Sequence, residues 1–144
     1  MIIREHIYEK FINDSDPIFD MNIGLMHEIR KYCQDRDPNL NTLEEFLLHC
    51  VNTRKHKYVK YLLDKGANVH TGNIAFTDYN KNDDIPMRYA IFNHDLKMVK
   101  LLLKYGASIK IALDDISDIE YFIHSYNIKE NVELANIIRK YFNK

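Results

Sequence analysis

Apolar side chains between residues 85 and 110 recur at helical spacing in two short runs. Met87, Ala90 and Ile91 share one face of a first predicted helix. Pro86 suits the first turn of that helix, because the main-chain N–H that proline lacks has no helical partner there. The pattern therefore predicts that a short helix begins near residue 85.

A second run of apolar side chains follows after the polar break Asn93-His94-Asp95. It comprises Leu96, Val99, Leu102 and Leu103, which again lie on one helical face. Gly106 then ends the pattern, as a glycine in left-handed conformation does just past a helix. The two helices are too short to bury their apolar faces alone, so they need a neighbour of the same kind.

Such a neighbour exists in the sequence as an internal repeat. Residues 58–69, YVKYLLDKGANV, match residues 98–109, MVKLLLKYGASI, at an offset of 40. The offset pairs Val59 with Val99 and Gly66 with Gly106.

The combined segment IPMRYAI…MVKLLLKYGASI resembles the pattern TPLH-x-A-A…V-x-x-LLL-x-x-GA of the ankyrin-repeat family. The earlier copy keeps mainly the second half of this pattern, with FLLHCV at residues 46–51 in place of the first. The resemblance implies an all-α ankyrin-repeat solenoid of about four helix-turn-helix units, hence about eight helices.

On this interpretation residues 1–144 form a single ankyrin-repeat domain. Residues 1–40 are expected to be a degenerate N-terminal repeat, and residues 41–70 a repeat. Residues 71–110 are a repeat with an extended finger loop, and residues 111–144 a C-terminal capping repeat. Terminal repeats are expected to be atypical, because their outer faces meet water.

The same periodicity predicts the individual helices at residues 2–12, 25–34, 43–52, 58–65 and 116–125, with a last helix opening at residue 130 or 131. It assigns no element to residues 18–24. Thr42 and Glu45 have the spacing of a capping box at the start of the helix 43–52. The connection that includes residues 72–84 is about seven residues longer than the family period allows, and Ile74 with Phe76 would suit a short strand in it.

Composition adds few constraints. The formal net charge is −1, so bulk electrostatics imply neither a nucleic-acid nor a membrane partner. The chain shows no targeting signal, and no apolar run approaches the roughly 18 residues that a membrane span needs. We therefore expect a cytoplasmic or nuclear location. Cys33 and Cys50 are widely spaced, which favours two reduced thiols over a disulfide.

No motif predicts catalysis, a cofactor or a metal. Asp78-x-Asn80-x-Asn82 begins like a calcium loop, but Asp83 stands where glycine is needed and Tyr89 where a glutamate ligand is needed. The histidines lack metal-ligand spacing, and the isolated glycines exclude phosphate loops. We expect a protein that is not an enzyme.

Two residues stand where the family has others. Arg88 replaces the histidine of TPLH, and we expect it to pair with Asp83, Asp84 or a main-chain carbonyl. His94 takes the place of a family glycine in left-handed conformation.

Charged side chains cluster at two places in the sequence. Four acidic residues near a predicted helix start are interpreted as helix capping: Asp114, Asp115, Asp118 and Glu120. A small basic patch is interpreted as a solvated surface too small for nucleic acid: Arg54, Lys55, Lys57 and Lys60.

The resemblance implies that a partner meets the finger loop and the exposed positions of the first helices. Carried onto this sequence, the candidate protein-binding residues are His49, Thr53, Phe76, Tyr79, Tyr89, Phe92 and Asn93. Exposed tyrosine and phenylalanine are typical of interaction hot spots. The alternative is that Tyr89 and Phe92 pack against a neighbouring repeat.

The function that follows is a non-enzymatic module that binds a partner protein. The bias towards Lys, Asn, Ile and Tyr resembles ankyrin proteins of large DNA viruses or intracellular bacteria, which implies an effector acting on a host protein. The alternative is a structural or assembly protein that self-associates through its repeat faces. A monomer is expected over a homo-oligomer.

Overall fold

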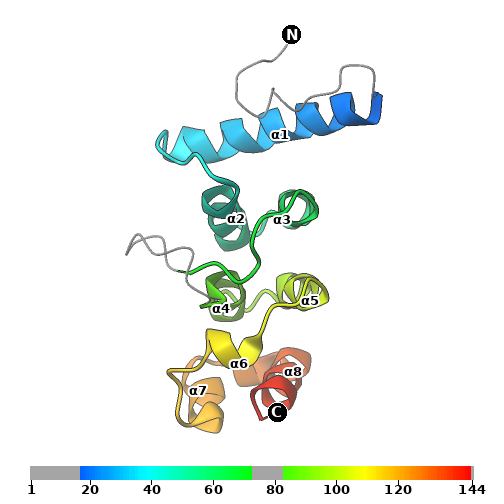
Figure 1. The fold of residues 1–144 in the computed structure, drawn as a ribbon. Helices are drawn as coiled ribbons and strands as arrows, with labels where there is room; N and C mark the ends of the chain where they lie inside the picture. The colour runs from blue at the N-terminus through cyan, green and yellow to red at the C-terminus, as the bar shows by residue number, and fades with distance from the viewer. Residues whose placement is uncertain (1–16, 73–82, 144) are drawn as a thin grey trace. The chain divides into compact units, whose positions relative to one another are not determined.

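A computed structural model describes residues 17–72 and 83–143, and for residues 17–23 only the main chain. The chain divides into two compact units, residues 1–39 and residues 40–144, and each is described by itself. Within the described ranges every regular element is a helix (Figure 1).

The first unit contains one long helix, α1 (Pro17–Arg36). It includes the predicted helix 25–34 and also residues 18–24, to which the sequence pattern assigned nothing. Asp20, Asn22 and Gly24 weaken the apolar periodicity there. Helix formation is cooperative, however, so a helix formed over the clearer segment extends over the weaker one. Pro17 is tolerated in its first turn, where the missing N–H has no helical partner. The predicted helix 2–12 lies outside the described residues.

The second unit contains the remaining helices. They are α2 (Leu43–Asn52), α3 (His56–Asp64), α4 (Ile85–Phe92), α5 (Leu96–Lys104), α6 (Ile109–Ala112), α7 (Ile119–Ser125), the 3-10 helix η3 (Ile128–Glu130) and α8 (Val132–Phe142). In Figure 1, α2 and α4 lie in one row and α3 and α5 in a second row beside it. Two helix pairs therefore stack on each other, as the internal repeat predicted.

The core of the second unit consists of the apolar faces read from the sequence. Met87, Ala90 and Ile91 of α4 are fully buried, and so are Val99 and Leu102 of α5. Burying one such aliphatic side chain stabilises the fold by roughly 1.5–3 kcal/mol. The helix pairs are thus held together mainly by the repeated apolar positions.

Side-chain caps fix where several helices begin. The predicted capping box is confirmed: Glu45 N–H donates to the Thr42 hydroxyl at 3.1 Å, and Thr42 N–H donates to the Glu45 carboxylate at 3.0 Å. Asp95 caps α5 by accepting from Met98 N–H at 3.2 Å. Substituting such a cap by alanine typically costs about 1 kcal/mol.

The turn between the two helices of each pair contains a non-glycine residue in left-handed conformation. The φ angles are 64° at Arg54, 55° at His94 and 60° at Asn127. The prediction for His94 is confirmed. Gly66 and Gly106, which follow α3 and α5, also have positive φ angles of 101° and 93°, so the prediction for Gly106 is confirmed too.

The C-terminal segment differs from the sequence prediction in two ways. The short helix α6 was not predicted, and α7 begins at Ile119 instead of residue 116. Ser108 and Asp118 cap these two helices with their side chains, and such caps fix boundaries that apolar spacing leaves open. Helix α6 packs against both α4 and α8, so it adds a short element to the expected capping repeat.

Candidate functional site

The predicted contact residues on α2 and α4 occupy matching positions. His49 and Tyr89 are 40 residues apart. So are Thr53 and Asn93, the residues that directly follow α2 and α4. Helix α2 packs against α4, and all four side chains are partly exposed. The repeat therefore presents the same two positions twice on neighbouring helices.

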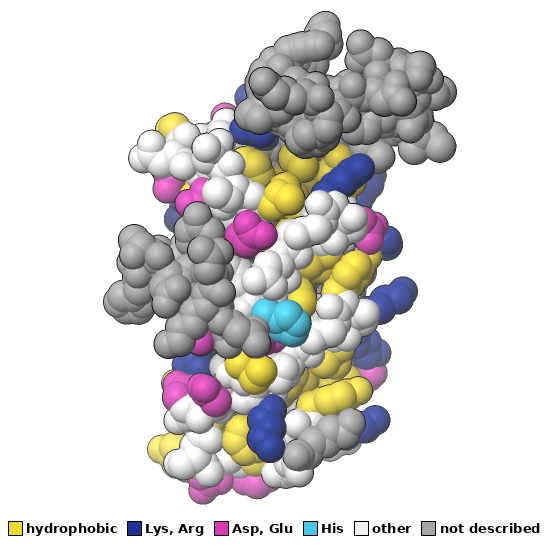
Figure 2. Space-filling view, in the orientation of Figure 1, with side chains coloured by type: hydrophobic (Ala, Val, Ile, Leu, Met, Phe, Trp, Pro, Cys, Tyr) yellow, Lys and Arg dark blue, Asp and Glu magenta, His cyan; other side chains and the backbone are white. Residues whose placement is uncertain are grey.

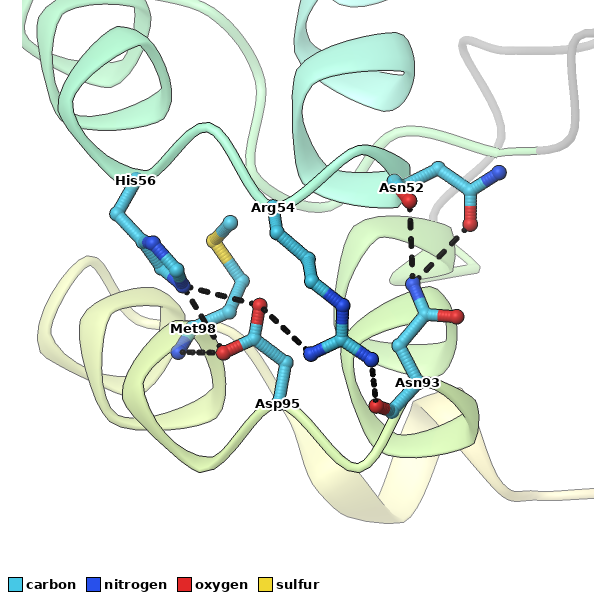
Figure 3. Close-up of polar contacts among 6 residues, drawn as sticks. All are labelled: Asn52, Arg54, His56, Asn93, Asp95 and Met98. Atoms are coloured by element: carbon cyan, nitrogen blue, oxygen red, sulfur yellow. Dashed lines mark hydrogen bonds and ion pairs between the residues drawn. The ribbon is translucent and has the colours of Figure 1, made fainter.

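Asn93 bonds to the end of α2 in the preceding helix pair, whereas Thr53 bonds within its own helix. The Asn93 amide donates to the Asn52 side-chain oxygen at 3.1 Å and to the Asn52 main-chain oxygen at 3.5 Å (Figure 3). The Thr53 hydroxyl donates to the His49 carbonyl at 2.8 Å. Of these two predicted contact residues, Asn93 thus links the two helix pairs, and Thr53 fixes only the end of α2.

A buried carboxylate lies beside these residues, as Figure 3 shows. Asp95 is 5% exposed and accepts from His56 Nε2 at 2.9 Å and from Met98 N–H at 3.2 Å. Arg54 lies 3.8 Å from the same carboxylate and donates to the Asn93 carbonyl. A buried charge needs partners of this kind, so Asp95 ties the second helix pair to the first.

Phe92 packs against a neighbouring repeat, which is the alternative that the sequence left open. Its ring centroid lies 5.5 Å from that of Phe122 and 5.2 Å from that of Tyr126, so it packs against α7 and the turn after it. The Arg88 guanidinium lies 5.0 Å above the same ring. Phe92 nevertheless remains 37% exposed, so part of the ring is accessible to a partner.

Arg88 pairs with Asp115, which sequence reasoning did not name as its partner. It donates to both Asp115 carboxylate oxygens, at 2.7 Å and 3.1 Å, and to the Ala112 carbonyl at 3.0 Å. The prediction of a main-chain carbonyl is confirmed, whereas Asp83 and Asp84 were the wrong acidic partners. The hydrogen bonds from Arg88 lower the pKa of Asp115 below its ordinary value.

The wrong assignment has a topological reason. Arg88 contacts the segment that follows α6. The sequence pattern did not predict the helix α6, so it could not place Asp115 beside Arg88. Within the acidic group read as helix capping, Asp118 does cap α7, while Asp115 and Glu120 form ion pairs with Arg88 and Arg139.

The base of the finger loop is held by a second buried carboxylate, which sequence reasoning also missed. Asp84 is 0% exposed and accepts from His70 Nδ1 at 3.0 Å and from Ser108 N–H at 2.6 Å. The preceding pair has a matching bond, from Asn68 N–H to Glu44 at 3.0 Å. The 40-residue offset between Glu44 and Asp84 is the signal that could have identified them.

The finger itself, including Phe76 and Tyr79, lies outside the described residues, as do Asp78, Asn80 and Asn82 of the calcium-like sequence. Among the described residues no group of three or more His, Cys, Asp or Glu side chains could hold a metal ion. None of the described helices is long and apolar enough to cross a membrane. Cys33 and Cys50 are both buried.

Comparison with known proteins is informative about this arrangement. The family model for ankyrin repeats in three copies matches residues 20–112. A putative ankyrin repeat protein of fowlpox virus (strain NVSL) is 41% identical over 68 residues. That match covers 46% of this chain but only 9% of the viral protein. No solved structure matches the chain.

Proposed function

This chain belongs to the ankyrin-repeat family, and on that premise we propose that it binds a partner protein through the exposed faces of α2 and α4 together with the finger loop. Ankyrin repeats generally mediate protein–protein interaction, and the family is typically non-enzymatic. The proposed contact residues in the described region are His49, Thr53, Tyr89, Phe92 and Asn93, to which the finger adds Phe76 and Tyr79.

The observation that carries this proposal is the matched pair His49 and Tyr89 on two helices that pack against each other. The Asp95 contacts with the preceding turn hold these helices in register before any partner arrives. A surface that is already ordered pays less conformational entropy on binding. Tyrosine is also among the side chains enriched at hot spots, so Tyr89 is the proposed centre of the contact.

The similarity to a fowlpox virus protein and the composition support a further element of this proposal. The partner is a protein of a host cell, and the chain meets it in the cytoplasm or nucleus. The whole viral relative is much longer than the matched segment, so its own partners are not transferred to this chain.

The test is affinity purification from host-cell extract, read by mass spectrometry, with Tyr89→Ala and Tyr58→Ala compared with the unmodified chain. Tyr58 is a matched control because it is also partly exposed but lies on α3, in the other helix row. We expect Tyr89→Ala to lose a protein that Tyr58→Ala retains, with melting temperatures within about 4 °C of each other. Retention by Tyr89→Ala, or a comparable loss of stability, would contradict the proposal.

A second candidate function is self-association. Four large apolar side chains of the described residues are exposed, and all lie between residues 92 and 132: Phe92, Tyr121, Tyr126 and Val132. A second copy of the chain could cover them. Light scattering at two protein concentrations tests this candidate, and a constant monomer mass would exclude it.

A further inference from the structure

Charge is divided unequally between the two helix rows of the second unit. The helices α3, α5 and α8 together carry seven Lys or Arg residues and two Asp or Glu residues. The helices α2, α4 and α7 carry one Arg and three Glu residues. Figure 2 shows dark-blue side chains along the edge that α3, α5 and α8 form, with few magenta ones between them.

The 40-residue repeat aligns these charges into rows. Lys57 and Lys60 of α3 correspond to Lys97 and Lys100 of α5, so equivalent lysines face outward from neighbouring helices. We call Lys57, Lys60, Lys97, Lys100, Lys104 and Lys140 the lysine stripe; all six are exposed. The basic patch around residues 54–60, which appeared small in the sequence, is thus one end of a larger surface.

Half of the lysine stripe is available to a ligand. Lys60 pairs with Asp64 at 2.9 Å, and Lys100 pairs with Glu133 at 2.5 Å. Within the described part of the chain, Lys57, Lys97 and Lys104 make no ion pair or side-chain hydrogen bond. These three ammonium groups therefore extend into solvent without compensation, and an anionic partner would gain from meeting them.

The neighbouring side chains favour an acidic protein segment over nucleic acid. Nonspecific binding of single strands uses aromatic rings on which bases stack. Here a lysine ammonium group already lies over the rings of Tyr61 and Tyr141, 5.5 Å and 5.4 Å from their centroids, and the Tyr105 hydroxyl donates to Asp64. Arg139 donates from Nε and Nη2 to the two Glu120 carboxylate oxygens, at 2.7 Å and 3.0 Å. This pair of donors is therefore not available for a bidentate contact with a phosphate.

We propose that the lysine stripe binds an extended acidic protein segment, separately from the partner contact on α2 and α4. Packed helices lie about 8–10 Å apart. A polyproline II segment has three residues per turn and a rise of about 3.1 Å, so every third residue recurs on one side at about 9 Å. This recurrence matches the separation of packed helices, so one carboxylate of the segment would pair with Lys57 on α3 and the next with Lys97 on α5.

The test uses a fluorescent peptide of Glu-Ser-Pro repeats, about 12 residues long, and the full chain, followed by fluorescence anisotropy. The variant is Lys57→Glu with Lys97→Glu. The control is Lys31→Glu with Lys129→Glu, which changes the net charge equally at exposed positions outside the lysine stripe. Circular dichroism checks that each variant is folded.

At about 50 mM salt we expect the unmodified chain to bind the peptide, and binding to weaken as salt rises. The Lys57 and Lys97 variant is expected to bind about tenfold more weakly, and the control within about threefold of the unmodified chain. No binding at low salt, or an equal loss in the control, would overturn the proposal. So would tighter binding of an oligothymidylate of equal length, which would identify nucleic acid as the ligand.

Discussion

His56 and Asp95 join the two helix pairs, because the His56 imidazole contacts both oxygens of the Asp95 carboxylate. The His56 Nε2 atom lies 2.9 Å from one oxygen of the Asp95 carboxylate, and only 5% of Asp95 is exposed. The two residues are 39 apart in the chain, one beginning α3 and the other capping α5. The same carboxylate that starts a helix therefore fixes that helix against the preceding repeat.

Replacing this carboxylate is expected to destabilise the second unit. Asp95→Ala removes a helix cap and leaves His56 without its partner, which together should lower the free energy of unfolding by about 2–3 kcal/mol. Lys55 is the matched control, because it holds the equivalent position before α3 and makes no side-chain cap. Urea unfolding of Lys55→Ala should differ by less than about 0.5 kcal/mol. Similar losses in both variants would show that the His56 contact adds little.

His94 offers a stabilising change. Its φ angle is 55°, where a side chain strains the main chain, and His94→Gly should relieve that strain. Glycine also costs conformational entropy on folding, so we expect the free energy of unfolding to rise by only about 0.5 kcal/mol, measured by chemical unfolding. The control is the opposite substitution, Gly106→Ala. A Cβ at Gly106 would meet nothing within 4 Å, so this variant measures only the strain of a side chain at positive φ. It should cost about 1–2 kcal/mol. A loss of stability in His94→Gly would contradict this account.

The Phe92 contact can be separated from its role at a binding surface by a double-mutant cycle. Phe92→Ala and Tyr126→Ala each remove one ring of a pair whose centroids lie 5.2 Å apart. Thermal unfolding of both single variants and the double variant should give a coupling energy of about 0.5–1.5 kcal/mol. A coupling of zero would mean that the ring faces solvent in practice, and that its exposed part is free for a partner.

The ion pair of Arg88 and Asp115 predicts a pH dependence. Arg88 lowers the pKa of Asp115 in the folded state. The ion pair therefore contributes its full stabilisation at pH values above the ordinary carboxyl pKa. It disappears as the pH falls through the lower folded pKa. Since the Asp115 side chain is 56% exposed, Asp115→Asn should cost only about 0.5 kcal/mol at neutral pH.

Urea unfolding at successive pH values below about 5 should show this difference shrinking towards zero. Asp114→Asn is the control, since the neighbouring Asp114 is exposed and is not an Arg88 partner. A difference that grows on acidification would mean that the Asp115 carboxylate is not held by Arg88.

Much of the fold follows from local sequence features. The apolar faces of α4 and α5, the capping box of Thr42 and Glu45 and the left-handed Gly106 are set by spacing and residue type within a few positions. A repeat offset then predicts which helices stack, because equivalent apolar positions must bury each other. The matched positions of His49 and Tyr89 follow from the same offset.

The polar contacts between repeats were decided only by the tertiary structure. Asp95 with His56, Asp84 with Ser108 and Arg88 with Asp115 join residues that are 24 to 39 positions apart. The repeat offset marks Glu44 and Asp84 as equivalent positions, but it does not indicate their partners. Each pair depends on where turns and the short helix α6 place two side chains in space. The lysine stripe has the same origin: the sequence contains its lysines, but only the stacking of α3, α5 and α8 brings them onto one surface.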